Sequence, residues 1–84
     1  MGDNEDNKIY VVGAAWCGYS RKMYAEVEAS PYKDRFVIME ATGKDKDHAF
    51  CKNIHGFPTL KNSKGETKQT GYVPITAALL AKFD

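Results

Sequence analysis

Apolar and polar positions predict two strands joined by a helix in the first half of the chain. Residues 9–12 are rich in β-branched and aromatic side chains, as strands are. Over about 18–29, apolar residues recur at helical spacing, and Ser30-Pro31 would end that helix. The continuous apolar run 36–39 predicts a second strand, buried on both faces and therefore central in the sheet. Because a helix connects the two strands, we expect them to be parallel, in a right-handed βαβ unit.

The second half of the chain predicts a further helix, a hairpin and a last helix. A short helix is expected over about 47–53, after a polar stretch. Residues 59–61 and 67–70 predict the two strands of a hairpin across the turn at 63–65. Pro74 suits the first turn of the last helix, because the fixed φ of proline is already helical. The apolar face of this helix would hold Ile75, Ala78, Leu79 and Phe83.

Length and composition limit the protein to a single small domain. The chain has 84 residues, of which 43% are apolar and 27% charged, with a net charge of +1. We expect one modest core and a monomer over residues 8–84. The weak net charge does not favour nucleic acid or an anionic membrane as the main partner, and no apolar run is long enough to span a bilayer. Residues 1–7 predict a disordered acidic tail, and the lack of a secretory signal favours the cytoplasm.

Cys17 is the first candidate for chemistry, because it lies at the junction between the first strand and the first helix. There its sulfur can approach free backbone N–H groups and the positive end of the helix dipole. Both favour the thiolate, the nucleophile in thiol–disulfide exchange, so we expect a pKa well below the free-cysteine value of about 8.5. Cys51 is expected to be a half-buried helix cysteine. Two cysteines without zinc-site spacing favour neither a disulfide-stapled scaffold nor a metal site.

Two motifs resemble the active site of thioredoxin-fold oxidoreductases. Trp-Cys-Gly at 16–18 follows the first strand, and Phe-Pro-Thr at 57–59 precedes the hairpin. Gly71, followed by the last helix, also matches the thioredoxin pattern. The resemblance covers residues 8–84. It implies a minimal thioredoxin-like, glutaredoxin-sized α/β fold of order βαβαββα, with a four-stranded mixed sheet flanked by three helices. The first and last helices would cover one face of the sheet and the second helix the other.

The resemblance assigns roles to the residues of the two motifs. Cys17 would be the attacking thiolate, and Trp16 would pack beside it. Pro58 would be a cis-proline opposite the cysteine, which would leave the backbone of Phe57 facing the cleft to pair with an extended substrate. The substrate-binding residues that it implies are Trp16, Gly18, Tyr19, Phe57, Pro58 and Thr59.

Ser20 departs from the family, whose two-cysteine sites carry a resolving cysteine at this position. A serine cannot attack the mixed disulfide, but its hydroxyl can hydrogen-bond the Cys17 thiolate and lower its pKa. We therefore place Ser20 with Cys17 among the catalytic residues. Three explanations stay open. Ser20 is an introduced change in a Cys-Gly-Tyr-Cys protein, or the protein is naturally monothiol and uses glutathione, or the fold has lost redox turnover and kept binding.

Other positions show which members of the thioredoxin-fold superfamily the chain resembles and where it differs from them. Val11 stands where thioredoxins carry a buried acid, so proton handling is expected to differ. Cys-Gly-Tyr-Ser at 17–20 resembles the monothiol glutaredoxins, which bind glutathione and an iron–sulfur cluster. Their glutathione-binding Gly-Gly-x-Asp is replaced by Thr-Gly-Tyr-Val at 70–73, which disfavours a cluster. A further resemblance, to the thioredoxin-like domain of vitamin K epoxide reductase homologues, rests in part on Glu40 and Cys51, and would make Cys51 an orphaned half of a disulfide.

The sequence therefore predicts a thiol–disulfide oxidoreductase with its redox-active centre at Cys17 and no cofactor. Its substrate would be a protein disulfide or glutathione disulfide, with an upstream thiol reductant and glutathione as a candidate co-substrate. Ser20 would block turnover as a dithiol enzyme. The alternatives are a monothiol glutaredoxin-like glutathione-binding protein and a non-catalytic module that captures an extended peptide on Trp16, Tyr19 and Phe57.

Overall fold

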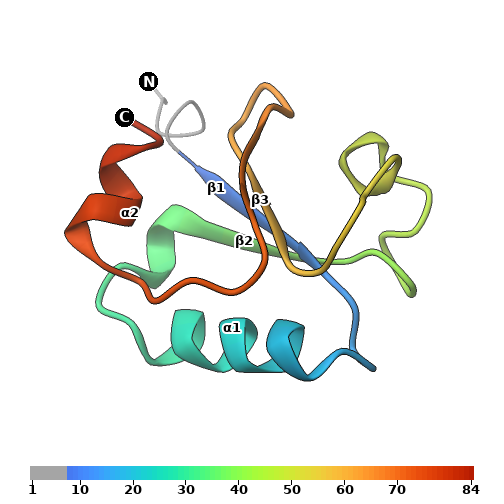
Figure 1. Cartoon of the computed structure of the whole chain (residues 1–84), viewed down its shortest axis with the longest axis horizontal. Helices are drawn as coiled ribbons and strands as arrows, with labels where there is room; N and C mark the ends of the chain where they lie inside the picture. The colour runs from blue at the N-terminus through green and yellow to red at the C-terminus, as the bar shows by residue number, and fades with distance from the viewer. Residues whose placement is uncertain (1–7) are drawn as a thin grey trace.

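Strand β1 (Ile9–Gly13) lies inside a four-stranded mixed sheet of order β2-β1-β3-β4. This sheet is the centre of a small α/β fold in a computed structural model, which describes residues 8–84 (Figure 1). β1 pairs in parallel with β2 (Phe36–Glu40) and antiparallel with β3 (Thr59–Lys61). β3 pairs antiparallel with β4 (Thr67–Thr70), so the predicted hairpin and the predicted parallel pair are both confirmed. The predicted tail over 1–7 lies outside the described residues.

The prediction that the apolar run 36–39 forms a central strand is wrong, because β2 is an edge strand. Phe36 and Met39 are buried, at 8% and 7% exposure, while the other three residues of β2 are only half-buried. A continuous apolar run indicates that both faces of a strand are covered, and it carries no information on whether both edges are paired. The strands with a neighbour on each edge are β1 and β3.

Helix α1 (Gly18–Ala29) begins and ends where the sequence predicts. The last helix, α2 (Ala77–Ala81), begins later than expected, because the hydroxyl of Thr76 caps it by accepting the Leu79 N–H at 3.2 Å. Pro74 therefore precedes the helix instead of lying in its first turn. In residues 8–84, no helix has both the length and the apolar character needed to cross a membrane.

The prediction of a third helix over 47–53 is wrong. The described chain has two α-helices and two short 3-10 segments, η2 (Lys33–Arg35) and η3 (Ala49–Cys51). The ring Nδ1 of His48 accepts the Phe50 N–H at 3.0 Å and starts η3. The chain leaves the helical region at Lys52, whose backbone is extended, and Asn53 follows with a φ of +58°. The helical segment therefore consists of the single turn Ala49–Cys51.

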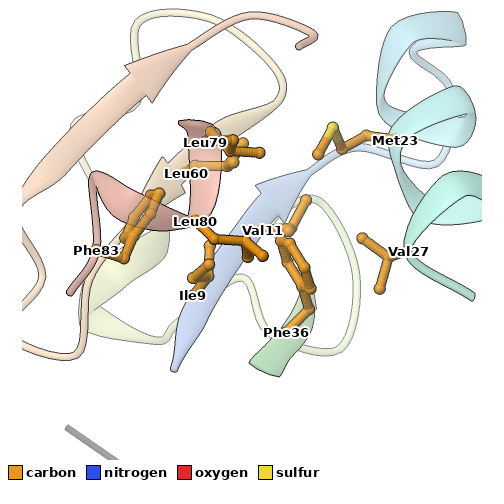
Figure 2. Close-up of a cluster of buried hydrophobic side chains, with 9 residues drawn as sticks. All are labelled: Ile9, Val11, Met23, Val27, Phe36, Leu60, Leu79, Leu80 and Phe83. Carbon is orange, nitrogen blue, oxygen red and sulfur yellow. The ribbon is translucent and has the colours of Figure 1, made fainter. Parts of the chain in front are cut away.

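Both α-helices pack on the same face of the sheet. Side chains from α1, α2 and three strands form one buried cluster (Figure 2). The cluster contains Ile9, Val11, Met23, Val27, Phe36, Leu60, Leu79, Leu80 and Phe83. On the alternate positions of β1, Tyr10 meets Phe50 of η3 edge to face, with ring centroids 5.0 Å apart. The segment with η3 therefore takes the place of the expected second helix.

Candidate active site

Cys17 lies at the point where β1 has ended and α1 begins. It is the N-cap residue of α1, with an extended backbone. Its N–H donates to the carbonyl of Ala14 at 2.9 Å, and its own carbonyl accepts the Arg21 N–H at 3.0 Å as the first hydrogen bond of the helix. The thiol is therefore held beside the first-turn N–H groups, which have no acceptor within the helix. This is the strand-to-helix position that the sequence predicts.

The pKa of Cys17 is lowered, which agrees with the expectation in direction. The largest cause is the backbone N–H of Ser20, followed by the Ser20 hydroxyl, both of which hydrogen-bond the thiolate. Burial raises the pKa of Cys17 and so opposes this effect. The N–H of Tyr19 and the charge of Arg21 lower the pKa further. The Arg21 guanidinium is fixed nearby, because it donates to the carbonyl of Ala15 at 2.8 Å. Compared with a free cysteine, these contacts favour the thiolate, which is the nucleophilic form of the sulfur.

Ser20 is completely buried, although it follows two exposed residues. Its Oγ accepts the Ala14 N–H at 3.1 Å, which ties α1 to the turn before Cys17. A Cβ at Gly13 would lie 2.8 Å from that Oγ, so glycine is needed for the close approach of α1 to the end of β1. Ser20 thus has two contacts at once, one with the turn and one with the thiolate.

The two sequence motifs meet at Cys17. The Phe57–Pro58 peptide bond is cis, as predicted. The Cys17 thiol donates to the carbonyl of Phe57 with an S-to-O distance of 3.9 Å. Pro58 is fully buried and accepts the Gly71 N–H at 2.7 Å, while the hydroxyl of Thr59 donates to the Gly56 carbonyl at 2.6 Å. The proline loop is therefore held from both sides with its backbone next to the sulfur.

Two exposed aromatic residues flank Cys17 in the sequence, and each contacts a half-buried aromatic ring. Trp16 and Tyr19 are 67% and 64% exposed on either side of Cys17 in the sequence. Trp16 meets Phe57 edge to face at 5.7 Å between ring centroids, and Tyr19 stacks on Tyr72 at 6.4 Å. Exposed apolar surface of this kind is typical of binding sites. We define the aromatic rim as Trp16, Tyr19, Phe57 and Tyr72.

Two neighbours of the site have no role in the sequence-based prediction. Tyr72 joins the rim from the segment after β4, and the Nζ of Lys22 lies 4.7 Å from the centre of its ring. The carboxylate of Glu40, at the end of β2, accepts the N–H of Ala15 at 3.0 Å in the turn before Cys17. For Tyr72, the one sequence signal is its position directly after Gly71. The contact between Glu40 and Ala15 depends on the register of β1 and β2, which the sequence does not specify.

Cys51 is free and lies at the end of η3. Its half-buried state is as predicted, although the element is a 3-10 turn. Burial raises the pKa of its thiol, and the charge of Asp45 raises it further. Among residues 8–84, the structure gathers no three histidine, cysteine, aspartate or glutamate side chains in a geometry that could hold a metal ion.

Comparisons with family models, with curated proteins and with solved structures gave no match to this chain. The candidate site therefore has to be interpreted from its own geometry.

Proposed function

We propose that the protein is a thioredoxin-fold thiol–disulfide oxidoreductase that uses Cys17 as its nucleophile. The observation that carries this proposal is the position of the Cys17 sulfur, at the N-terminus of α1 and 3.9 Å from the carbonyl of Phe57 in the cis-proline loop. The hydrogen bonds that lower the pKa of Cys17 come from the first turn of the same helix. A sulfur activated in this way and open to solvent is suited to attack a disulfide.

In the proposed reaction, the Cys17 thiolate attacks one sulfur of a substrate disulfide. The substrate S–S bond breaks, a new S–S bond joins Cys17 to the substrate, and the other substrate sulfur leaves as a thiolate that takes up a proton. Ser20 has no thiol to resolve this mixed disulfide. An external thiol such as glutathione must therefore attack it and release the second substrate thiol, and a second external thiol then regenerates Cys17. Two external thiols are oxidised to one disulfide, and the substrate disulfide is reduced to two thiols.

The surroundings of Cys17 fit a polypeptide or glutathione disulfide as substrate. The backbone of Phe57 beside the sulfur is available for pairing with an extended chain, as in strand addition. The aromatic rim offers apolar contact area on both sides of the thiol. Recognition would therefore depend on the backbone and on apolar side chains next to the substrate disulfide.

Glutathione disulfide provides a direct test of the proposal. The purified, reduced protein is incubated with glutathione disulfide near neutral pH, and intact and peptide masses identify the modified cysteine. We expect one glutathionyl group at Cys17, no adduct in Cys17→Ser, and an unchanged adduct in the matched control Cys51→Ser. Modification of Cys51 at the same rate as Cys17, or no adduct at all, would contradict the proposed function.

A second candidate is a non-catalytic module that binds an extended peptide, and the exposed rim favours it. Trp16 and Tyr19 are both largely exposed and offer aromatic surface to a partner whether or not the thiol reacts. If binding is the function, Cys17→Ala keeps affinity for a partner, whereas the enzyme loses covalent capture with the same change. An affinity and a covalent assay on one variant distinguish the two candidates.

A further inference from the structure

The Glu40 carboxylate connects three segments near Cys17. Glu40 is the last residue of β2 and the parallel neighbour of Gly13 in β1. Its Oε2 accepts the Ala15 N–H at 3.0 Å, the Thr42 N–H at 3.3 Å and the Thr42 hydroxyl at 2.5 Å. Its Oε1 accepts the hydroxyl of Tyr24, from α1, at 3.4 Å. One side chain thus receives donors from the turn before Cys17, from α1 and from the segment after β2.

The contact with Ala15 matters most, because Ala15 lies in the turn that carries Cys17. The N–H of Ala15 is held by Glu40, and its carbonyl is held by the Arg21 guanidinium at 2.8 Å. The neighbouring Ala14 donates to Ser20 and accepts from Cys17. Every polar backbone group of these two alanines therefore has a partner. Glu40 is the partner that comes from outside the turn and outside α1.

The charge of Glu40 is stabilised by its donors. Burial tends to raise its pKa, but the hydrogen bonds from Thr42, Ala15 and Tyr24 outweigh burial and lower it, so the carboxylate is ionised at neutral pH. The titratable groups that face it are Tyr24, Asp45 and Cys51. The Asp45 Oδ2 accepts the Glu40 N–H at 2.8 Å, which fixes the backbone of Glu40 as well. The four hydrogen bonds that the carboxylate accepts come from uncharged donors, namely two backbone N–H groups and the hydroxyls of Thr42 and Tyr24.

We propose that Glu40 is a positioning residue for Cys17, because its carboxylate holds the Ala15 amide and thereby fixes the turn that places the thiol at the start of α1. This inference rests on the proposed function. If Glu40 acts by positioning, the length of its side chain matters more than its charge, because the length brings the carboxylate to the Ala15 amide. A negative charge acting directly on the thiol would disfavour the thiolate, whereas correct placement of the thiol favours it. The two effects have opposite signs, so a pair of variants can separate them.

Glu40→Asp keeps the charge and loses the reach, since the side chain is shorter by one C–C bond of about 1.5 Å. Glu40→Gln keeps the reach and loses the charge. Its amide oxygen can accept from Ala15 and Thr42, and its NH₂ can donate to the Tyr24 hydroxyl oxygen, whose proton can go to the Met39 carbonyl at 3.1 Å. Both changes are conservative, and both variants are made in a Cys51→Ser background so that a single thiol reacts.

The readout is the rate of Cys17 alkylation by iodoacetamide as a function of pH, with the midpoint of thermal unfolding measured in parallel. We expect Glu40→Asp to raise the pKa of Cys17 and to slow alkylation at pH 7 about threefold or more, and Glu40→Gln to stay within about twofold of the parent. Glu66→Gln is the matched control, because Glu66 also accepts a side-chain hydrogen bond, from Asn62 at 2.7 Å, but lies by the hairpin turn. It should leave alkylation unchanged.

Three results would overturn the inference: an unchanged profile in Glu40→Asp, a loss in Glu40→Gln as large as in Glu40→Asp, or a change in thermal stability alone. Alkylation does not require a disulfide substrate. If the parent protein forms no adduct with glutathione disulfide, the proposed function fails, while the alkylation profiles still decide the role of Glu40. The two failures are therefore distinguishable.

Discussion

Cys17 and Cys51 are both free and both partly exposed, yet their thiols have opposite pKa shifts. Cys17 precedes the first turn of the 12-residue α1, where backbone N–H groups hydrogen-bond the thiolate. Cys51 is the last residue of the three-residue η3. There burial raises the pKa, the charge of Asp45 adds to it, and the opposing charge of Lys61 does not compensate.

Partial exposure alone therefore does not lower the pKa of a cysteine in this fold. A helix start offers free N–H groups, and a helix end offers free carbonyls, which are no help to a thiolate. The contact with the proline loop does not add to this difference in pKa, because the Phe57 carbonyl accepts a hydrogen bond from the Cys17 thiol and so favours its neutral form. The chemistry of the molecule is therefore expected at one of two otherwise similar thiols.

The largest expected effect comes from Ser20→Cys, which would give Cys17 a resolving partner. An attack from the same chain replaces a bimolecular step, so we expect at least about a tenfold gain in turnover of a protein disulfide with dithiothreitol as donor. Ser30→Cys, at the other end of α1, is the control and should give no gain. The absence of a gain in Ser20→Cys would favour the monothiol or the binding explanation.

A pH series sharpens the comparison of the two thiols without any mutation. Because the pKa of Cys17 is lowered and that of Cys51 is raised, Cys17 holds more thiolate at every pH between the two values. At pH 7 we expect iodoacetamide to alkylate Cys17 about tenfold faster than Cys51, or more. The ratio should fall as the pH rises above both pKa values. A ratio that does not depend on pH would mean that access, and not ionisation, separates the thiols.

Ser20→Ala tests the second-largest cause of the Cys17 shift. It removes the hydroxyl that stabilises the thiolate and leaves the Ala14 N–H without its acceptor at a buried position. We expect a raised Cys17 pKa, alkylation about two- to threefold slower at pH 7, and a loss of about 1–2 kcal/mol in the free energy of unfolding. Ser30→Ala is the matched control, since its Oγ accepts the exposed Tyr32 N–H at 2.9 Å. Equal alkylation in both variants would contradict a role for the Ser20 hydroxyl.

The sequence predicts this site better than it predicts the sheet. Local signals were sufficient for Cys17 at the start of α1 and for the hairpin, because spacing and turn residues act over a few positions. The cis Phe57–Pro58 bond followed from motif resemblance, not from local pattern. The edge position of β2 was not predictable from 36–39, since an apolar run reports covered faces and not paired edges. The prediction of a helix over 47–53 failed because the backbone leaves the helical region at Lys52 and Asn53, after a single turn, and the spacing of apolar residues carries no information on this ending.

Contacts between segments far apart in the chain could not be predicted from the sequence either. Tyr72 reaches Tyr19 only after β3 and β4 have paired, and Glu40 reaches Ala15 only through the parallel register of β1 and β2. These contacts depend on the strand pairings, which no short window of sequence specifies. They are also the contacts that shape the rim and the turn around Cys17.

The smallest expected effect concerns Cys51. Asp45→Asn removes the charge that, after burial, most raises the pKa of Cys51, while the amide oxygen can still accept the Glu40 N–H in place of the carboxylate oxygen at 2.8 Å. We therefore expect the Cys51 pKa to fall and its alkylation at pH 8 to speed up about twofold, because a charge that is only half-buried is partly screened by water. Cys17 should be unaffected, since the charges acting on it include Arg21 and not Asp45. Peptide masses from one alkylation reaction report both thiols at once. A parallel change at Cys17 would show that the two sites are coupled through Glu40, and the contrast between the thiols would then belong to one network.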